Sequence, residues 1–412
     1  EPYRRQRQMC IRDRIMTLVE RFLKYVSFPT TSGEDREGKC STDGQYVLAE
    51  ELKKELSELG LTDISSNEYG IVYSTLKGEG NLTIALLAHM DTSPSASGEN
   101  IKPRIIENYD GTDIELSPNI YLKPQEFETL KDKKGHKLIV TDGKTLLGGD
   151  DKAGIAIIMT VLDELIKENK KHVNIEVIFT TDEEIGTGVH HVEMDKIHAA
   201  YGYTVDGGSS KYINKSNFNA INMEVTIKGR SVHPGSAKNK MINANTYAMI
   251  YDHSLPQFER PEYTEKREGF FHLCEMKGSE EEVHLSYILR DFSKSDLDHR
   301  CYIAKKTAEE INHSLGYEAV EVTLIPCYNN MEDILEKNPQ VIKRITDAYK
   351  SLNLDYEFED IRGGTDGAQL SFRGLPCPNL GTGDYNCHGR FEYVDVNEME
   401  TMVKVLKQML IK

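Results

Sequence analysis

The side chains best suited to chemistry in this chain are carboxylates and imidazoles that follow short apolar segments. They are His89, Asp91, Asp150, Glu183, Glu184, Asp206 and His388. In an open sheet of parallel strands, ligand sites form outside the carboxyl ends of the strands, so groups that follow several strands meet at one edge. Imidazole nitrogens and carboxylate oxygens without a thiolate suit Zn²⁺, or alternatively Co²⁺ or Mn²⁺, in a hydrolase. The sequence therefore predicts a site for a pair of divalent metals.

The histidines of this set each have a structural alternative. His89 and Asp91 come directly after the apolar run Leu82–Ala88. A carboxylate close to a ligating histidine can fix the orientation of the imidazole and raise its basicity. The same pattern also fits a polar strand end with a capping aspartate. His388, taken alone, is more often a structural histidine than a ligand.

Two groups of adjacent carboxylates are also open to two interpretations. Asp150 and Asp151 lie in GGDDKAG, between a glycine pair and a predicted helix. One of them can bridge two metals, or the pair can cap the helix and complement its dipole. The acidic run 182–184 follows the apolar segment Val173–Phe179. It can supply a metal ligand and a neighbouring general base, or it can be a solvated acidic loop.

The elements that must position these residues alternate between strands and helices. The continuous apolar run Leu82–Ala88 is typical of a strand buried on both faces, and Val173–Phe179 and Ala200–Val205 are predicted to be two further buried strands. Helices are predicted at Gln45–Leu59 and Ile155–Asn169 from their apolar periodicity. This alternation predicts an α/β fold with a mixed, largely parallel sheet.

A second, smaller α+β domain is predicted inside this core. Over 218–330 the pattern changes to strands of alternating polarity and amphipathic helices. The catalytic domain would then be discontinuous, comprising 16–217 and 331–412. The Arg- and Gln-rich residues 1–15 are interpreted as a non-native or disordered extension. The segment 92–137, rich in Pro, Gly and Asn, is predicted to be a surface excursion.

Composition excludes several classes of partner. The 412 residues include 50 basic and 67 acidic side chains, a net charge of −17. This balance argues against binding to nucleic acids or anionic membranes. No apolar run approaches the roughly 20 residues that a membrane-spanning helix needs. The seven cysteines are scattered and form no CxxC pair, which predicts reduced thiols and a cytoplasmic location.

Longer strings in the chain are more specific than any single residue. They are AHMDTSP, TDGKTLLGGDDKAG, YTVDGG, VHPGSAK, YILRDF, IRGGTDGAQLSF and GLPCPNLGTG. In their order and content they resemble the M20 family of di-zinc metallopeptidases and, within it, the tripeptide aminopeptidases. The resemblance extends from about Met16 to the C-terminus. It implies a zinc-exopeptidase-like catalytic domain and an inserted lid and dimerisation domain.

The resemblance also implies a role for each residue of the metal site. Asp91 would orient a ligating histidine, and Glu183 would be the general base. The Asp150–Asp151 peptide would be cis. The ligands that the resemblance assigns to two Zn²⁺ per subunit are the bridging Asp150, with His89 and Asp206 on one ion and Glu184 and His388 on the other.

Three residues of the inserted domain would contact the substrate, again by resemblance. His233, in VHPGSAK, would stabilise the oxyanion of the tetrahedral intermediate, and in dimeric relatives it comes from the partner subunit. Arg290, in YILRDF, would bind the C-terminal carboxylate of a short peptide, and Arg362 is a second candidate contact. The expected enzyme is a homodimeric tripeptide aminopeptidase.

Two other functions remain open from the sequence. The first is a di-zinc dipeptidase or N-acyl amino acid deacylase of the same family. The second is a metal-free binding protein on the same fold, which is disfavoured because all five ligand positions and Glu183 are present.

Overall fold

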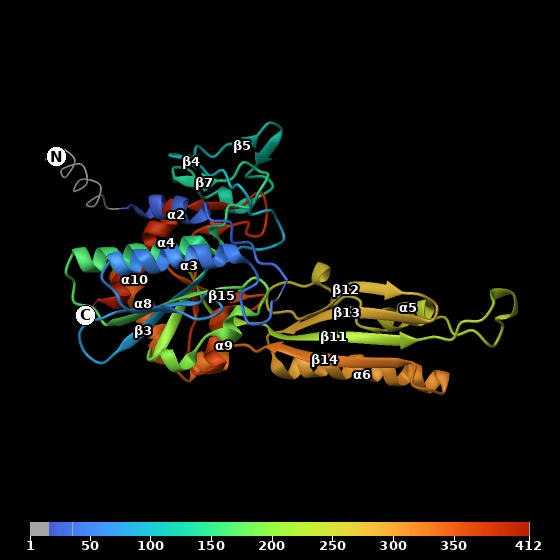
Figure 1. The fold of residues 1–412 in the computed structure, drawn as a ribbon. Helices are drawn as coiled ribbons and strands as arrows, with labels where there is room; N and C mark the ends of the chain where they lie inside the picture. Colours follow the sequence, from blue (N-terminus) through green and yellow to red (C-terminus); the bar gives the residue numbers. More distant parts are fainter. Residues whose placement is uncertain (1–15, 35, 412) are drawn as a thin grey trace. The chain divides into compact units, whose positions relative to one another are not determined.

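The computed structural model describes residues 16–34 and 36–411, so the predicted extension at 1–15 lies outside the described residues. The chain folds into two compact units (Figure 1). The first contains the chain through Ile213, together with Lys337–Phe358 and Arg373–Lys412. The second contains Asn214–Glu336 and Glu359–Phe372, the latter a segment that the sequence analysis placed in the catalytic domain.

An eight-stranded mixed sheet, in the order β1-β2-β8-β3-β9-β16-β10-β15, lies mainly in the first unit, while its strands β10 and β15 begin in the first unit and end in residues of the second. Its strands are β1 (Thr62–Ser66), β2 (Val72–Leu76), β3 (Thr83–His89), β8 (Asn174–Thr180), β9 (Tyr201–Val205), β10 (Tyr212–Asn217), β15 (Glu357–Ile361) and β16 (Asn379–Leu380). The central strand β3 pairs in parallel with both β8 and β9, whereas β2 pairs antiparallel to β8. The predicted α/β class with a mixed, largely parallel sheet is therefore confirmed.

Helices pack against this sheet and against one another. They are α2 (Leu18–Val26), α3 (Asp43–Glu58), α4 (Gly149–Lys167), α8 (Pro339–Ser351) and α10 (Val396–Leu410). Helix α4 contacts α2, α10 and β3, and its side chains are almost all buried as far as Leu165. A helix that is apolar on all sides belongs in the interior of a domain, which explains the unbroken run GIAIIMTVL.

Two smaller sheets of the first unit, β17-β18-β7-β4 and β5-β6, include the strands on either side of His388. Their strands are β4 (Arg104–Ile106), β5 (Ile114–Ser117), β6 (Ile120–Leu122), β7 (Leu138–Val140), β17 (Asp384–Tyr385) and β18 (Tyr393–Asp395). The order β17-β18-β7-β4 joins the 92–137 region to the chain on either side of His388. This region was predicted to be a surface excursion, and its residues Tyr109, Leu122 and Leu130 share an apolar cluster with β7 and with Tyr393 of β18.

The second unit has a four-stranded antiparallel sheet in the order β12-β13-β11-β14. The strands are β11 (Asn219–Lys228), β12 (Phe270–Gly278), β13 (Glu282–Asp291) and β14 (Val320–Tyr328), and the helices are α5 (Ala244–Ser254), α6 (Lys294–Leu315), α7 (Glu332–Glu336) and α9 (Asp366–Phe372). Alternate residues of β11 and β13 are buried against α5 and α6 in one apolar cluster. Among the helices of the described residues, none is both long and apolar enough to cross a bilayer.

Candidate metal centre

The predicted ligands lie at one edge of the main sheet because β8, β3 and β9 are parallel neighbours. Strand β3 ends at His89, and Asp206 directly follows β9. The acidic run 182–184 begins two residues beyond the end of β8. The carboxyl ends of the three strands therefore deliver an imidazole and several carboxylates to the same place, as expected for this class of sheet.

Asp150 is the residue around which the predicted ligands meet. Its Oδ1 lies 2.8 Å from His89 Nε2, and its Oδ2 lies 3.0 Å from His388 Nε2. Glu184 Oε2 is 2.9 Å from the same His388 nitrogen, and Asp206 Oδ1 is 3.7 Å from His89 Nε2. The structure thus brings all five predicted ligands together, although His388 is separated from Asp206 by about 180 residues of chain.

The turn that carries Asp150 has an unusual backbone at the start of α4. Gly148 adopts a left-handed conformation with φ 81°, and neither Asp150 nor Asp151 has helical dihedral angles. The peptide bond between these two aspartates is cis. Asp151 is buried and accepts the backbone N–H groups of His89 at 3.2 Å and Gly154 at 3.1 Å. Asp151 therefore ties the turn to the end of β3, while Asp150 faces the imidazoles.

Glu392 holds the same turn from the other side, and the sequence analysis did not single it out. Its side chain is 1% exposed. One carboxylate oxygen accepts the N–H groups of Leu147 and Gly148 at 2.5 and 2.9 Å, and the other accepts that of Asp150 at 3.2 Å. Glu392 lies four residues after His388, in the sequence CHGRFE at 387–392, and this proximity was the only signal for it in the sequence. It links the segment that bears His388 to the turn that bears Asp150.

Asp91 organises the turn that follows β8. Its Oδ1 accepts the N–H of Glu183 and its Oδ2 accepts the N–H of Glu184, both at 3.1 Å. Asp91 Oδ1 also lies 3.3 Å from His89 Nδ1, the ring nitrogen that faces away from Asp150. Ser32 donates a hydrogen bond to Asp91 Oδ2. Like Glu392, Ser32 was not singled out from the sequence. One buried carboxylate thus aligns His89 with the turn that carries Glu183 and Glu184.

The imidazoles and carboxylates of the centre shift one another's pKa. Hydrogen bonds that His388 donates to Asp150 and Glu184 raise the pKa of His388 to about 11. Burial opposes protonation of His89, but its contacts with Asp150 and Asp206 raise its pKa well above the ordinary value. Burial likewise opposes ionisation of Asp150, yet the two imidazoles hold the pKa of this carboxylate far below its ordinary value. A site that retains protons this firmly is strongly attractive to cations.

The donor set and one orphaned atom fit a divalent metal. Ligand atoms of His89, Asp150 and Glu184 all lie within 4.8 Å of one another. A second group of the same spacing contains His89, Asp151 and Asp206, but Asp151 already accepts two backbone N–H groups. Glu184 Oε1 is buried and, among the described residues, has no hydrogen-bond partner. A buried carboxylate oxygen without a donor is costly unless a cation satisfies it.

The three predicted substrate contacts belong to the second unit. His233 is exposed in the 3-10 turn Pro234–Ser236, where its Nδ1 accepts the N–H of Gly235 at 3.1 Å. Arg290 lies on β13 with its guanidinium 4.9 Å from the centre of the Tyr328 ring. Its Nη1 is buried and lacks a hydrogen-bond partner among the described residues. Arg362, by contrast, donates to the side chain of Thr264 at 3.1 Å and to backbone carbonyls.

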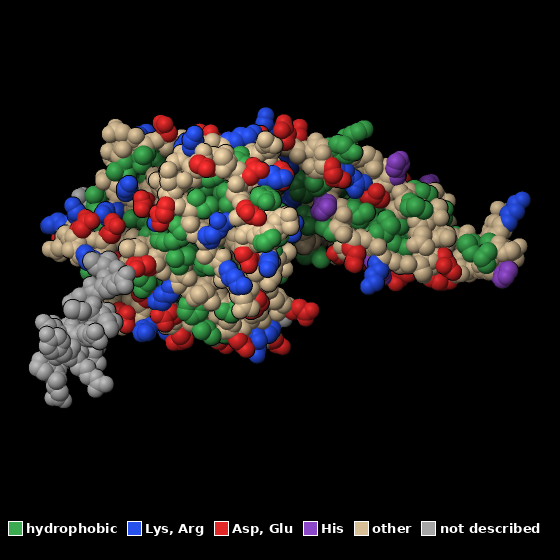
Figure 2. Space-filling view, turned by 90° about the horizontal axis from the view of Figure 1, so that it is seen from above, with side chains coloured by type: hydrophobic (Ala, Val, Ile, Leu, Met, Phe, Trp, Pro, Cys, Tyr) green, Lys and Arg blue, Asp and Glu red, His purple; other side chains and the backbone are tan. Residues whose placement is uncertain are grey.

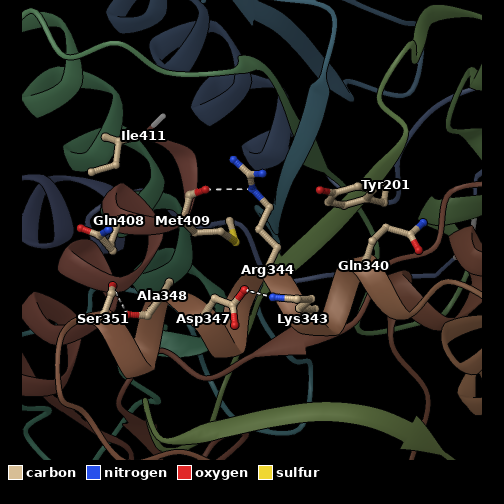
Figure 3. Close-up of a pocket in the computed structure, with 10 residues that line it drawn as sticks. All are labelled: Tyr201, Gln340, Lys343, Arg344, Asp347, Ala348, Ser351, Gln408, Met409 and Ile411. Atoms are coloured by element: carbon tan, nitrogen blue, oxygen red, sulfur yellow. Dashed lines mark hydrogen bonds and ion pairs between the residues drawn. The ribbon is translucent and has the colours of Figure 1, made fainter.

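A separate cavity of about 450 Å³ lies in the first unit, and it contains none of the predicted site residues (Figure 3). It is lined by Tyr201, Gln340, Lys343, Arg344, Asp347, Ala348, Ser351, Gln408, Met409 and Ile411. Its charged groups have internal partners: Arg344 donates to the carbonyl of Met409 at 2.9 Å, and Lys343 pairs with Asp347. This cavity therefore lacks the donor set found around Asp150.

Comparison with known proteins supports the same interpretation. The sequence model of peptidase family M20/M25/M40 matches residues 130–412. Peptidase T of Bacillus velezensis is 45% identical over 395 residues, which cover 94% of this chain and 96% of that protein. Peptidase T of Clostridium novyi is 44% identical over 399 residues, covering 95% of this chain and 98% of that protein.

Solved structures share the fold at lower sequence identity. The aminopeptidase PepT from Bacillus cereus superposes with a TM-score of 0.74 at 22% identity, covering 95% of this chain and 97% of its own. A tripeptidase from Staphylococcus aureus gives a TM-score of 0.75 at 21% identity, with 95% and 96% covered. A dinuclear metal-binding peptidase of Bacillus subtilis gives 0.61 at 14% identity, with 95% and 96% covered.

Proposed function

Because the chain belongs to peptidase family M20/M25/M40 and, within it, to the peptidase T enzymes, we propose that it is a metal-dependent aminopeptidase that releases the N-terminal residue of tripeptides. The observation that carries this proposal is the meeting of five nitrogen and oxygen donors around Asp150. This arrangement supports hydrolysis at a metal pair, and the kinship with peptidase T supports the tripeptide substrate.

The donors around Asp150 would hold two Zn²⁺ ions. Asp150 presents one oxygen to each imidazole, which is the geometry expected of a bridging carboxylate. We favour Zn²⁺, with Co²⁺ or Mn²⁺ as substitutes, because imidazole and carboxylate without thiolate suit hydrolytic sites for these ions. When bound, a metal pair polarises a carbonyl oxygen and lowers the pKa of water. The assigned ligands are His89 and Asp206 for one ion, Glu184 and His388 for the other, and Asp150 for both.

Glu183 is the proposed general base. Its backbone is fixed by the hydrogen bond to Asp91, directly before the ligand Glu184, so the base and a ligand share one anchored turn. Glu183 would take a proton from the attacking water and later deliver it to the leaving amine. Asp91 would keep His89 in the orientation that its contact with Asp150 requires. These roles need no movement of the turn, because its N–H groups are already held.

The second unit would bind the substrate backbone and its free carboxylate. The unpartnered Nη1 of Arg290 is a donor suited to the C-terminal carboxylate of a tripeptide. Arg362 would be a second contact, and His233 would stabilise the oxyanion. We further propose a homodimer formed through this unit and a cytoplasmic location. Figure 2 shows acidic and basic side chains interspersed over the face that it draws.

The proposal is tested by metal content together with the hydrolysis of matched di-, tri- and tetrapeptides with free termini. Apo protein loaded with Zn²⁺ is expected to hold two ions per chain and to release the N-terminal residue from tripeptides. Glu183→Gln should keep both ions and lose hydrolysis. Preference for dipeptides or N-acyl amino acids would transfer the function to a related di-zinc hydrolase. Absence of both metal and turnover would favour a binding protein on the same fold.

The role of Arg290 has its own matched control. Arg290→Ala should raise the KM for tripeptides that have a free C-terminal carboxylate. It should have a much smaller effect on the hydrolysis of a peptide with an amidated C-terminus. Arg260→Ala changes an arginine of the same unit that already pairs with Asp252 at 2.9 Å, and it should leave this discrimination intact. Equal effects on free and amidated peptides would refute the carboxylate contact.

A further inference from the structure

A third group of potential metal ligands lies beside the candidate centre and is not used by the proposed function. Ligand atoms of Asp150, Asp384 and Cys387 all lie within 4.8 Å of one another. Asp384 begins β17, and Cys387 directly precedes His388 in the following turn. The group contains a sulfur atom, whereas the five predicted zinc ligands offer only nitrogen and oxygen.

Asp384 has an unsatisfied oxygen in a fully buried position. Its side chain is 0% exposed, and among the described residues no hydrogen-bond partner reaches its Oδ1. This oxygen points at the turn that bears Asp150, because a Cβ added to Gly149 would lie 2.3 Å from it. The other oxygen, Oδ2, accepts the thiol of Cys387 at 2.7 Å. The backbone N–H of Tyr385 is a further partner of this carboxylate. Neither it nor the weak S–H donor satisfies Oδ1, and a buried oxygen without a donor is costly unless a cation reaches it.

We propose that Cys387, Asp384 and Asp150 form a binding site for a thiophilic divalent cation, of which Cd²⁺ is the probe, and that a cation bound there withdraws Asp150 from the catalytic metal pair. Sulfur ligands select soft metals, and carboxylates add the charge that a divalent ion needs. On binding, a sulfur–metal bond replaces the S–H bond and the thiol proton leaves to solvent. The inhibitory part of this inference rests on the proposed function, since it requires Asp150 to serve the catalytic pair.

The position of Cys387 makes this capture possible without unfolding. Cys387 as a whole residue is partly exposed, so the site lies close to the surface. Cys327 provides a matched control, because it is also partly exposed and its thiol donates to the carbonyl of Ile325, away from the group of Asp150, Asp384 and Cys387. Any effect of Cd²⁺ on cysteines in general would therefore be shared by the two residues.

The test adds Cd²⁺ to the zinc-loaded full chain and records the ultraviolet cadmium–thiolate absorption together with peptidase activity. The unsubstituted chain and Cys327→Ser should both develop the band as activity falls. Cys387→Ser and Asp384→Asn should weaken the band. In Cys387→Ser the Cd²⁺ concentration for half-inhibition, relative to the rate of that variant without Cd²⁺, should rise by at least about tenfold.

Two results would overturn the inference. One is a band of unchanged intensity in Cys387→Ser, and the other is an unchanged half-inhibitory concentration in the same variant. Failure of the proposed function is distinguishable, because it would appear as absence of tripeptide turnover with Zn²⁺ alone. The cadmium–thiolate band would still report on the sulfur-containing site in that case.

Discussion

Replacing Glu392 by glutamine should weaken metal binding without unfolding the chain. The carboxylate of Glu392 accepts three backbone N–H groups from the turn that presents Asp150. An amide retains a single acceptor oxygen, and its NH₂ group must face at least one of these donors. Hydrogen bonds to a charged acceptor contribute about 1.5–3 kcal/mol each, so losing one predicts a decrease in metal affinity of roughly 10–100-fold.

The assay is a titration of apo protein with Zn²⁺ against a competing chelator, accompanied by thermal unfolding and by kinetics at saturating metal. A matched control is Glu176→Gln in the same unit. Glu176 is also buried and also accepts backbone N–H groups, those of His198 and Ala199, but it lies within β8, away from the metal centre. Both variants should lose stability, whereas only Glu392→Gln should lose metal affinity.

The refuting result is specific. If Glu392→Gln binds Zn²⁺ as tightly as the unsubstituted chain while its unfolding temperature falls, then Glu392 stabilises the fold but does not position Asp150. If Glu392→Gln weakens metal affinity but kcat is restored at saturating metal, the substitution affects metal binding and not the catalytic step. A loss of affinity of the same size in Glu176→Gln would also count against the reasoning.

Three further predictions concern protons, packing and charge. The pKa of His388 is raised to about 11 and that of His89 is also raised, so both imidazoles are protonated in apo protein near neutral pH. Zn²⁺ binding should therefore release close to two protons and tighten with rising pH. Calorimetry in buffers of different ionisation enthalpy would detect the released protons, and release of less than one proton would contradict the prediction. Gly154→Ala places a Cβ 1.9 Å from the carbonyl oxygen of Val205, so α4 must shift from the strand that leads to Asp206. We expect a loss of about 1–3 kcal/mol in urea unfolding and reduced metal content. Neither should follow from Gly363→Ala, where the nearest atom to the new Cβ, Ile361 Cγ2, lies at an ordinary contact distance of 3.9 Å. Arg21→Met removes the guanidinium that pairs with the buried carboxylates of Glu55 and Asp163, while Lys24 still pairs with Glu55 and Lys167 with Asp163. We therefore expect a loss of about 1–3 kcal/mol in the free energy of unfolding, less than for a buried charge left with no partner. Arg36→Met, which breaks an exposed pair with Asp43, should change it little, and similar losses in both would show that burial of the Arg21 pairs is unimportant.

The succession of strands and helices along the chain was largely predictable because the signal is local. Runs such as TIALLAH and NIEVIFT are mostly apolar, as expected of strands buried on both faces. The position of ligands at strand ends followed from the same pattern, since His89 and Asp206 stand next to their strands. Here a short apolar run identifies the strand, and the polar residue that follows it marks the carboxyl end of that strand.

Other features depend on contacts between distant segments, which no local pattern encodes. Glu392 reaches the N–H groups of residues 147–150, and Ser32 reaches Asp91, so their roles appear only when the chain is folded. The region 92–137 looked like a surface excursion because its turns are frequent. Its apolar residues are widely spaced, and they form a core only by packing with β18, which comes much later in the chain. Strand β16 has two residues, too few to produce any periodicity.

The place of β16 between β9 and β10 has a consequence for how the protein is made on the ribosome. Strand β9 and the ligand Asp206 are synthesised about 180 residues before His388. At about 5–20 residues per second, this interval lasts roughly 10–40 s. During that time β9 lacks its neighbour, and the nascent chain displays an apolar strand edge that another chain can pair with. The proposed ligand set is complete only after β16 and the segment that follows it have been made, so the nascent chain cannot hold a metal pair through all five residues before then.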